Sequence, residues 1–355
     1  GCVARPCMTS CKKNAIKMQN GRAVIDPDLC VNCGLCQKEC PYHAIIYMPV
    51  PCEEACPVGA ITKDQDGKEE IDYDKCTFCG KCMRACPFGA IMERSQMIDV
   101  LQRLKQKTSM TAMVAPAIIG QFSAELGQMV TALRKLGFDH VIEVAYGADM
   151  TAAHESEEFI ERMHNGENFM TTSCCPAFTE TVNKHLPELE PFVSDTPTPM
   201  HYTAEKARER WPDSHTVFIG PCVAKRHEAL DDDQVDFVLS IEELGSMFVS
   251  ADIDVQQCEP EELDMPAHAD GRGFAAVGGV SRAIEHAVNS VEVKSEQIDG
   301  LDKKQVRTLK RYPKSCDCNF LEVMACEGGC IAGPAVINNP KLAKRSLDKF
   351  LNNTV

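Results

Sequence analysis

The sequence predicts an α/β fold: a two-lobed domain of mainly parallel sheets with helices, preceded by a small α+β domain rich in cysteine. From residue 110 onward, apolar strand-like runs alternate with helical runs. Thirteen of the 21 cysteines lie before residue 90. With 44% hydrophobic and 25% charged residues, the 355-residue chain has the composition of a globular protein. We therefore expect a small domain over 1–93 and a large domain over 94–355.

The large domain is expected to alternate strands with helices. Helices are predicted over 94–110, 123–137 and 151–166, and strands over 111–119, 140–148, 215–220 and 236–240. Gly137 is suited to end the second of these helices as its C-cap. Such alternation indicates a parallel sheet covered by helices. We expect one lobe over about 110–212 and the other over about 213–340.

Charge and hydropathy exclude several classes of protein. The formal net charge of −15 argues against nucleic-acid binding, because phosphates require clustered Lys and Arg. No apolar run approaches the roughly 18 residues of a membrane span, so we expect a cytoplasmic protein without direct membrane insertion. The 21 cysteines suit either a disulfide scaffold or a metal protein. Because they fall in ligand-like runs, metal binding is favoured.

The cysteine-rich domain contains an internal repeat of the form C-x2-C-x2-C-x3-C-P. Its two copies are Cys30, Cys33, Cys36 and Cys40, and then Cys76, Cys79, Cys82 and Cys86. This run is typical of bacterial ferredoxins, in which three thiolates on one loop hold three irons of a [4Fe–4S] cluster. Zinc sites usually pair two C-x2-C units instead. The repeat therefore predicts a ferredoxin-like domain.

Partial copies of the repeat allow two assignments of cysteines to clusters. Their cysteines are Cys2, Cys7, Cys11, Cys52 and Cys56. In one pairing, Cys11 completes the cluster of the first full run and Cys56 that of the second, while Cys2, Cys7 and Cys40 hold a third cluster with a ligand upstream of Gly1. In the rival pairing, Cys40 and Cys86 join the two full runs directly. Either scheme gives two [4Fe–4S] clusters, which transfer electrons.

Three motifs of the large domain carry a second set of cysteines. They are TSCCPAF (172–178), GPCVAKRHE (220–228) and EVMACEGGCIAGP (322–334), and they offer Cys174, Cys175, Cys222, Cys326 and Cys330. Each motif lies where a predicted strand gives way to a loop or helix, the usual place for a site in an α/β domain. Four of the thiols would hold a buried cluster. Cys316 and Cys318 lie just before the third motif, where packing or solvent-facing thiols are favoured and another metal site is the alternative. Cys258 lies alone in an acidic loop and is interpreted as structural.

The three motifs resemble the signature motifs of [FeFe]-hydrogenases, over a stretch from about Cys76 to Pro334. The resemblance implies an H-cluster, which is a [4Fe–4S] cube bridged by a cysteine to a diiron subsite with CO, cyanide and aza-dithiolate. It implies that Cys175, Cys222, Cys326 and Cys330 hold the cube, with Cys330 as the bridge. It also implies that Cys174 passes protons, Lys225 hydrogen-bonds a cyanide, and Met324, Pro116 and Pro221 lie beside the cofactor.

A proton relay is also implied by this resemblance. Its matching positions are Cys174, Glu155, Ser194, Glu158 and Arg162. Glu155, Glu158 and Arg162 are spaced three and four apart, so they share one face of the helix expected over 151–166. Without the resemblance, a solvated face of salt bridges would be the simpler interpretation.

Some positions depart from the family pattern. Gly220 stands where methionine usually opens the second motif, Ala117 stands where serine commonly follows Ala-Pro, and AGPAV (332–336) replaces a glycine-rich stretch. These changes resemble a divergent branch of the family, which favours a sensory or electron-bifurcating role.

The resemblance implies reversible oxidation of H2 and reduction of protons. Expected partners are a redox protein such as ferredoxin or a flavin/NAD(P)-binding subunit within a hetero-oligomer, together with maturation proteins. The alternative is a non-catalytic relative, serving iron–sulfur assembly or electron transfer without the diiron.

Overall fold

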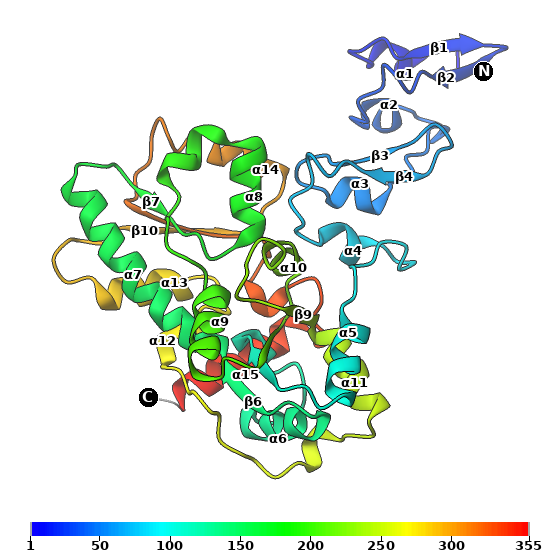
Figure 1. Cartoon of the computed structure of the whole chain (residues 1–355). Coiled ribbons are helices and arrows are strands. Elements are labelled where there is room, and N and C mark those ends of the chain that lie inside the picture. Colours follow the sequence, from blue (N-terminus) through cyan, green and yellow to red (C-terminus); the bar gives the residue numbers. More distant parts are fainter. Residues whose placement is uncertain (1, 354–355) are drawn as a thin grey trace. The chain divides into compact units, whose positions relative to one another are not determined.

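The computed structural model describes residues 2–353 and divides the chain into two compact units, Gly1–Val50 and Pro51–Val355. Figure 1 shows the course of the chain. We expected a boundary near residue 93, but residues 51–93 group with the large unit. Arg84 Nη1 donates to the Ala332 carbonyl at 2.6 Å, and a Cβ on Gly80 would lie 2.6 Å from Pro334. The second ferredoxin-type run therefore packs directly on the large α/β body.

The small unit consists of one hairpin between short helices. Its elements are α1 (Pro6–Thr9), β1 (Ile16–Gln19), β2 (Arg22–Ile25) and α2 (Leu35–Lys38). β1 and β2 pair antiparallel through a two-residue turn in which both Asn20 and Gly21 have positive φ, at 49° and 76°. Asn-Gly is the favoured pair for such a turn, because both residues tolerate the left-handed region.

The same order of elements opens the large unit. It comprises α3 (Pro51–Ala55), β3 (Ile61–Lys63), β4 (Glu69–Ile71) and α4 (Lys81–Ala85), with β3 and β4 antiparallel. The amphipathic helix α5 (Met97–Lys105) follows and buries Val100 against the main core. The helix predicted over 94–110 is thus present, although shorter.

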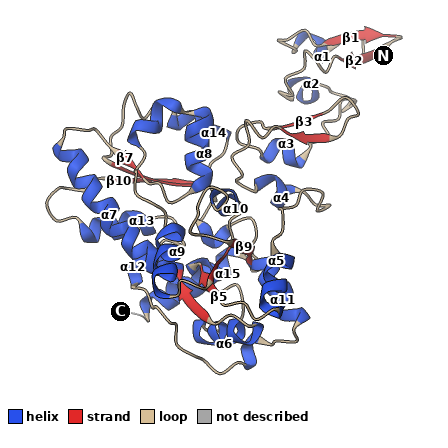
Figure 2. Cartoon of the chain, viewed as in Figure 1, coloured by secondary structure: helices blue, strands red, loops and turns tan. Residues whose placement is uncertain are grey.

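The first sheet of the α/β body has four parallel strands in the order β6-β5-β8-β9. They are β6 (His140–Glu143), β5 (Met110–Val114), β8 (His215–Gly220) and β9 (Phe237–Ser240). One core joins β5 to α5, α6 (Leu126–Leu136) and α11 (Ile241–Ser250). A second core joins the sheet to α9 (Pro199–Arg210) and the start of α7 (Val144–His164). Helices therefore cover the strands, as Figure 2 shows.

The second sheet has three parallel strands in the order β10-β11-β7. They are β10 (Ser295–Asp299), β11 (Phe320–Met324) and β7 (Met170–Thr171). One core includes residues of α8 (Pro176–His185) and α14 (Lys303–Leu309), and another includes α13 (Gly279–Ala287) and the far end of α7. Further helices are α10 (Ala224–Glu228), α12 (Ala269–Gly273) and α15 (Pro340–Asn352).

The parallel α/β fold class is confirmed, but the lobes are not consecutive stretches of chain. We expected lobes over about 110–212 and 213–340. Instead, α7 carries the chain from β6 in the four-stranded sheet to β7 in the other, and α9 leads back to β8. Val144 near the start of α7 packs on the first sheet, and Phe159 near its end packs on the second. α7 therefore ties the two sheets together.

The predicted ends of single helices and strands can be compared with the structure. α6 ends at Gly137, whose φ of 110° is the left-handed C-cap predicted for it. The strand expected over 140–148 ends earlier, because the chain becomes α7 at Val144. Within residues 2–353, no helix is both long and apolar enough to cross a membrane.

Candidate metal centre

The motif cysteines lie just past the carboxyl ends of parallel strands. Cys174 and Cys175 lie between β7 and α8, and Cys222 lies between β8 and α10. Cys326 and Cys330 follow β11. β7 and β11 belong to the three-stranded sheet, whereas β8 belongs to the four-stranded sheet. The site is therefore assembled from both sheets.

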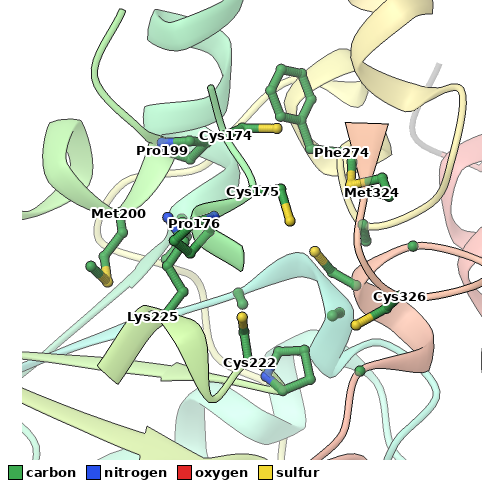
Figure 3. Close-up of a pocket in the computed structure, with 18 of the residues that line it drawn as sticks. Cys174, Cys175, Pro176, Pro199, Met200, Cys222, Lys225, Phe274, Met324 and Cys326 are labelled. Carbon is green, nitrogen blue, oxygen red and sulfur yellow. The ribbon is translucent and has the colours of Figure 1, made fainter. Parts of the chain in front are cut away.

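All five cysteines line one cavity. Four other residues singled out by the sequence line it too: Lys225, Met324, Pro116 and Pro221. Figure 3 shows the sulfur atoms of Cys175, Cys222 and Cys326 turned toward one central space. Cys330 is close enough to Cys175 and Cys222 for their charges to interact. These four thiols form a cluster-sized donor set.

Burial controls the acidity of these four thiols. It raises the pKa of Cys222 to about 12, with the charge of Cys175 adding to the effect. It also raises the pKa of Cys326 well above its usual range, and the pKa values of Cys175 and Cys330 are raised as well. Four thiolates in a dry cavity repel one another, so they need a cationic centre. A [4Fe–4S] cube takes four thiolates and meets this need, so the donor set fits it.

The loop that carries two of the thiols packs without spare room. Gly329 has φ of 89°, and a Cβ there would lie 2.8 Å from Ala276 Cα. A Cβ on Gly333 would lie 2.8 Å from the Pro221 Cβ. Glycine is needed at Gly329 because both the backbone angle and the close approach exclude a side chain. This packing fixes the positions of Cys326 and Cys330 on either side.

Lys225 reaches the cavity wall from α10 and is buried. Its Nζ donates to Thr198 Oγ1 at 2.9 Å and pairs with Glu228 Oε2 at 2.7 Å. Burial, the largest single cause, would lower the pKa of Lys225, but the charge and hydrogen bond of Glu228, together with the charges of Cys222 and Cys174, raise that pKa overall. A charged ammonium, bonded to Thr198 and Glu228, therefore lies in the cavity wall.

Two departures from the family pattern have a structural explanation. A Cβ on Gly220 would lie 2.6 Å from the ring of Phe218, and Phe218 itself lines the cavity. Glycine at this position makes room for that ring. Ala117 is fully buried and packs with Ala275 and Ala276. Ala117 lines the cavity, and alanine in place of serine makes this part of its wall more apolar.

Glu158 is the centre of a hydrogen-bonded chain that leads to the surface. Ser194 Oγ donates to its Oε2 at 2.6 Å, Thr196 Oγ1 donates to the same atom at 2.8 Å, and Arg162 pairs with its Oε1 at 2.7 Å. Burial would raise the pKa of Glu158, but these hydrogen bonds and the charge of Arg162 lower it overall. Glu158 and Arg162 line an open surface hollow of about 510 Å³.

Glu155 lies one helical turn before Glu158, between that chain and the cavity. It is fully buried, and its Oε1 accepts a hydrogen bond from the Ser173 amide at 3.4 Å. Its Oε2 is buried without a hydrogen-bond partner among the described residues. Burial, with repulsion from Glu158, raises the pKa of Glu155 to about 8. The charge of Glu155 also acts on Cys174, whose pKa burial raises well above its usual range.

Several lining residues were missed by the sequence analysis. Among them are Pro199, Met200 and Phe274, which Figure 3 shows around the site. Phe274 packs in one core with Met324, and Cys174 packs against that core. Phe274 lies in the glycine-rich stretch GRGFAAVGGV (271–280), which was a usable signal, whereas nothing in the local sequence marks Pro199 or Met200. Thr196 was also missed, although its place two residues after Ser194 was a usable signal.

A second group of four thiols lies next to the cavity. Cys56, Cys76, Cys79 and Cys82 line a hollow of about 490 Å³. Burial raises the pKa of Cys82 to about 11, and the charges of the other three add to this. Cys79 also lines the first cavity, and its charge acts on Cys326. The two donor sets are therefore neighbours.

Four cysteines of the ferredoxin-type region share one local turn. The thiols of Cys11, Cys40, Cys56 and Cys86 each accept a hydrogen bond from the amide four residues later, at 3.2–3.3 Å. Cys36 lies within electrostatic reach of Cys30 and Cys33. Cys52 lies within reach of Cys86. Cys7 lies in α1, and Cys2 lies just before it.

Two parallel sheets that enclose four cavity-lining thiols, in a chain with ferredoxin-type cysteine runs, define an iron–sulfur protein with an internal centre. The family described as "Iron only hydrogenase large subunit, C-terminal domain" matches residues 108–334. The chain belongs to this family. A 4Fe-4S binding domain matches residues 23–46 and 69–92.

The relatives include hydrogenases and a protein of another kind. The chain is 29% identical over 274 residues to iron hydrogenase 1 of Clostridium pasteurianum, covering 63% of this chain and 47% of that protein. It is 30% identical over 303 residues to the periplasmic [Fe] hydrogenase large subunit of Nitratidesulfovibrio vulgaris, covering 68% and 72%. It is also 25% identical over 262 residues to a probable cytosolic Fe-S cluster assembly factor of Drosophila erecta, covering 58% and 55%. The chain spans about half the length of the first and third relatives.

The fold is shared with solved [FeFe]-hydrogenases. The structure of HydA(deltaEFG) superposes with a TM-score of 0.61 at 21% identity, covering 72% of this chain and 88% of that chain. HydA1 from Chlamydomonas reinhardtii superposes with a TM-score of 0.58 at 20% identity, with the same coverage.

Proposed function

We propose that this protein is an [FeFe]-hydrogenase that reversibly converts dihydrogen into protons and electrons. Cys175, Cys222, Cys326 and Cys330 would hold the cube of an H-cluster, and Cys330 would bridge to the diiron. When bound, this cofactor supplies the metals at which dihydrogen is cleaved. The chain's own residues position it, exclude water and move protons and electrons.

The observation that carries the proposal is the pairing of a non-ligand thiol with a buried acid. Cys174 lies at the cavity beside the four ligand thiols, and Glu155 lies behind it with an unpartnered carboxyl oxygen. Because its pKa is raised to about 8, Glu155 exchanges a proton readily near neutral pH. A raised pKa keeps Cys174 a neutral thiol, which suits a proton donor in a dry pocket.

The proton would leave the cavity through neighbouring side chains. Cys174 Sγ gives a proton to Glu155, from which Ser194 Oγ relays it to Glu158 Oε2. Ser194 and Glu158 already share a hydrogen bond of 2.6 Å. Arg162 holds Glu158 at the surface hollow, where water takes the proton. Proton uptake would use the same chain in reverse.

Lys225 and the apolar wall would hold the cofactor in place. The Lys225 ammonium is buried and charged, which suits a hydrogen bond to an anionic cyanide. Met324, Pro116 and Pro221 contribute apolar surface on other sides of the cavity. Such a wall excludes water, which strengthens the electrostatic interactions inside.

Electrons would travel through the adjacent [4Fe–4S] cluster. We assign its ligands as Cys56, Cys76, Cys79 and Cys82, because these thiols line one hollow. Because Cys11 follows α1 as Cys56 follows α3, Cys11 would complete the cluster of Cys30, Cys33 and Cys36. Cys2, Cys7 and Cys40 would then remain for a third cluster. A redox protein or a flavin-containing subunit would receive the electrons, and maturation proteins would install the diiron.

The competing function is a non-catalytic role in iron–sulfur assembly. The likeness to an assembly factor favours it. Such a protein needs ligand thiols but no proton path. The buried Glu155, next to the hydrogen-bonded chain that runs from Ser194 through Glu158 to the surface, therefore favours the enzyme.

Infrared spectroscopy of the matured protein distinguishes the two. The hydrogenase should show CO and cyanide stretching bands and evolve H2 with a chemical reductant and an electron mediator. The control is the same protein purified without maturation proteins, which should retain its [4Fe–4S] clusters and show no such bands. Full cluster loading after maturation, with no bands and no H2, would exclude the proposal and support the assembly role.

A further inference from the structure

Two cysteines outside every cluster motif lie side by side just before β11. The Sγ atoms of Cys316 and Cys318 are 2.9 Å apart, and Cys316 Sγ donates to the Cys318 carbonyl at 3.1 Å. Cys318 is buried in a hydrophobic core with Leu321 and Val323, whereas Cys316 is partly exposed. The sequence pattern favoured unrelated packing or solvent-facing thiols. The contact instead makes them a pair.

We propose that Cys316 and Cys318 are a redox-active dithiol, which forms a reversible disulfide by exchange with a low-molecular-weight disulfide. A disulfide bond is about 2.05 Å long, so the two sulfurs need to approach by less than roughly 1 Å. Rotation of two short side chains supplies that movement. This pair uses none of the proposed cluster ligands, so the inference is independent of the hydrogenase proposal.

The difference in exposure sets the order of the exchange. Cys316, which solvent reaches, loses its proton and attacks the small disulfide, forming a mixed disulfide and releasing one small thiol. The Cys318 thiolate then attacks the Cys316 sulfur, forming the protein disulfide and releasing the second small thiol. The protein loses two electrons and two protons, and the small disulfide becomes two thiols.

The surroundings favour a slow, selective reaction. Tyr312 Oη donates to Glu296 Oε1 at 2.6 Å, and the Glu296 charge also acts on Cys318. Burial and the proximity of Cys316 raise the pKa of Cys318. Cys318 therefore stays a thiol until the mixed disulfide has formed next to it. Once that has happened, the 2.9 Å separation of the sulfurs makes the second step intramolecular.

Cys316 and Cys318 lie just before a strand that leads to the cavity of the candidate metal centre. Cys318 lies two residues before Phe320, where β11 begins, and the same strand ends at Met324 in the cavity wall. β11 is the central strand of its sheet. A disulfide here would tie the chain at the entry to the strand from which Cys326 emerges.

The test uses the full, cluster-loaded chain under anaerobic conditions. The protein is incubated with oxidised glutathione, and free thiols are alkylated in acidic denaturant. It is then digested with a protease that cleaves before aspartate. Because Asp317 lies between the two cysteines, cleavage there yields Asp302–Cys316 and Asp317–Leu347 as separate fragments unless a disulfide joins them. We expect joined fragments after oxidation and separate fragments after dithiothreitol, with unchanged iron content.

Single variants confirm which thiols are joined. In Cys318→Ser, we expect the fragments to separate and Cys316 to carry glutathione. In Cys316→Ser, Cys318 should be recovered almost entirely as free thiol. Cys258, a buried cysteine with no cysteine beside it in the described chain, is the matched control and should not react before denaturation. Separate fragments in the oxidised wild type, or joined fragments in Cys318→Ser, would overturn the proposal.

Discussion

The ferredoxin-type loops and the buried centre gather thiols in opposite ways. In the second full run, Cys76, Cys79 and Cys82 come together within seven residues, around a turn in which Phe78 and Gly80 both have positive φ. In the buried centre, Cys175 and Cys330 come from the ends of β7 and β11, and Cys222 comes from the other sheet. The loops need only local chain geometry, whereas the centre needs both sheets folded together.

The largest expected effect comes from removing one thiol of the buried centre. Cys222→Ala should abolish H2 turnover and lower the iron content by about four atoms per chain or more, since one cube ligand is lost. The signals of the loop clusters should persist. Iron analysis and electron paramagnetic resonance measure both results. Cys258→Ala, which removes a buried thiol elsewhere, is the control and should keep its full iron content.

The next effect tests whether Cys174 differs from its neighbour Cys175. Cys174→Ser should keep the infrared bands and iron content but slow H2 turnover at least ~100-fold, because a serine hydroxyl is a much weaker acid than a thiol. Cys175→Ser should instead lose the centre. If Cys174→Ser loses iron in the same proportion as Cys175→Ser, then Cys174 is a ligand and not a proton carrier.

Glu155→Gln should slow turnover by roughly 100-fold while leaving the centre assembled. It should also change how stability depends on pH. The pKa of Glu155 is raised from 4.5 to about 8 in the folded chain, so its neutral form is favoured by folding. That contribution is fully present below about pH 4.5 and is lost as the pH rises toward 8.

The apparent Tm measures this effect on the cluster-loaded protein. Between pH 5 and about 8, the wild-type Tm should fall relative to that of Glu155→Gln. An identical pH profile for the two proteins would contradict the raised pKa. Glu157→Gln, which changes an exposed carboxylate on the same helix, is the matched control.

The smallest effect is expected at the surface end of the relay. Arg162→Ala should slow turnover by less than about tenfold, because Arg162 positions Glu158 and water in the adjoining hollow can still carry the proton. Steady-state H2 evolution checks this. A loss as large as that of Glu155→Gln would show that Arg162 itself is indispensable to proton exit.

Much of the candidate site was predictable because its signals are local. The C-x2-C-x2-C-x3-C-P runs, the Cys174–Cys175 pair and the spacing of Glu155, Glu158 and Arg162 are short patterns. The hydrogenase family match over residues 108–334 covers all three cysteine motifs from which the resemblance was first drawn. Gly137 was equally predictable, because a helix C-cap depends on one residue's backbone freedom.

Other features depend on contacts between distant parts of the chain. The hydrogen bond from Ser194 to Glu158 joins residues 36 positions apart, and only the fold places Glu155 in a fully buried position. Local patterns also did not predict that the chain passes through α7 from one sheet to the other. A strand carries no signal for the sheet it joins, because any parallel partner satisfies its backbone hydrogen bonds.

The sequence by itself determined that this chain holds iron–sulfur clusters and has a helix-covered parallel fold. Cysteine spacing and hydrophobic periodicity decide both, and both are properties of neighbouring residues. The tertiary structure decided which thiols share a cavity, that Cys79 adjoins the buried centre, and that Cys316 and Cys318 touch. Ligand sets, proton paths and thiol pairs are defined by distances between atoms. Those distances exist only after the two sheets have packed around α7.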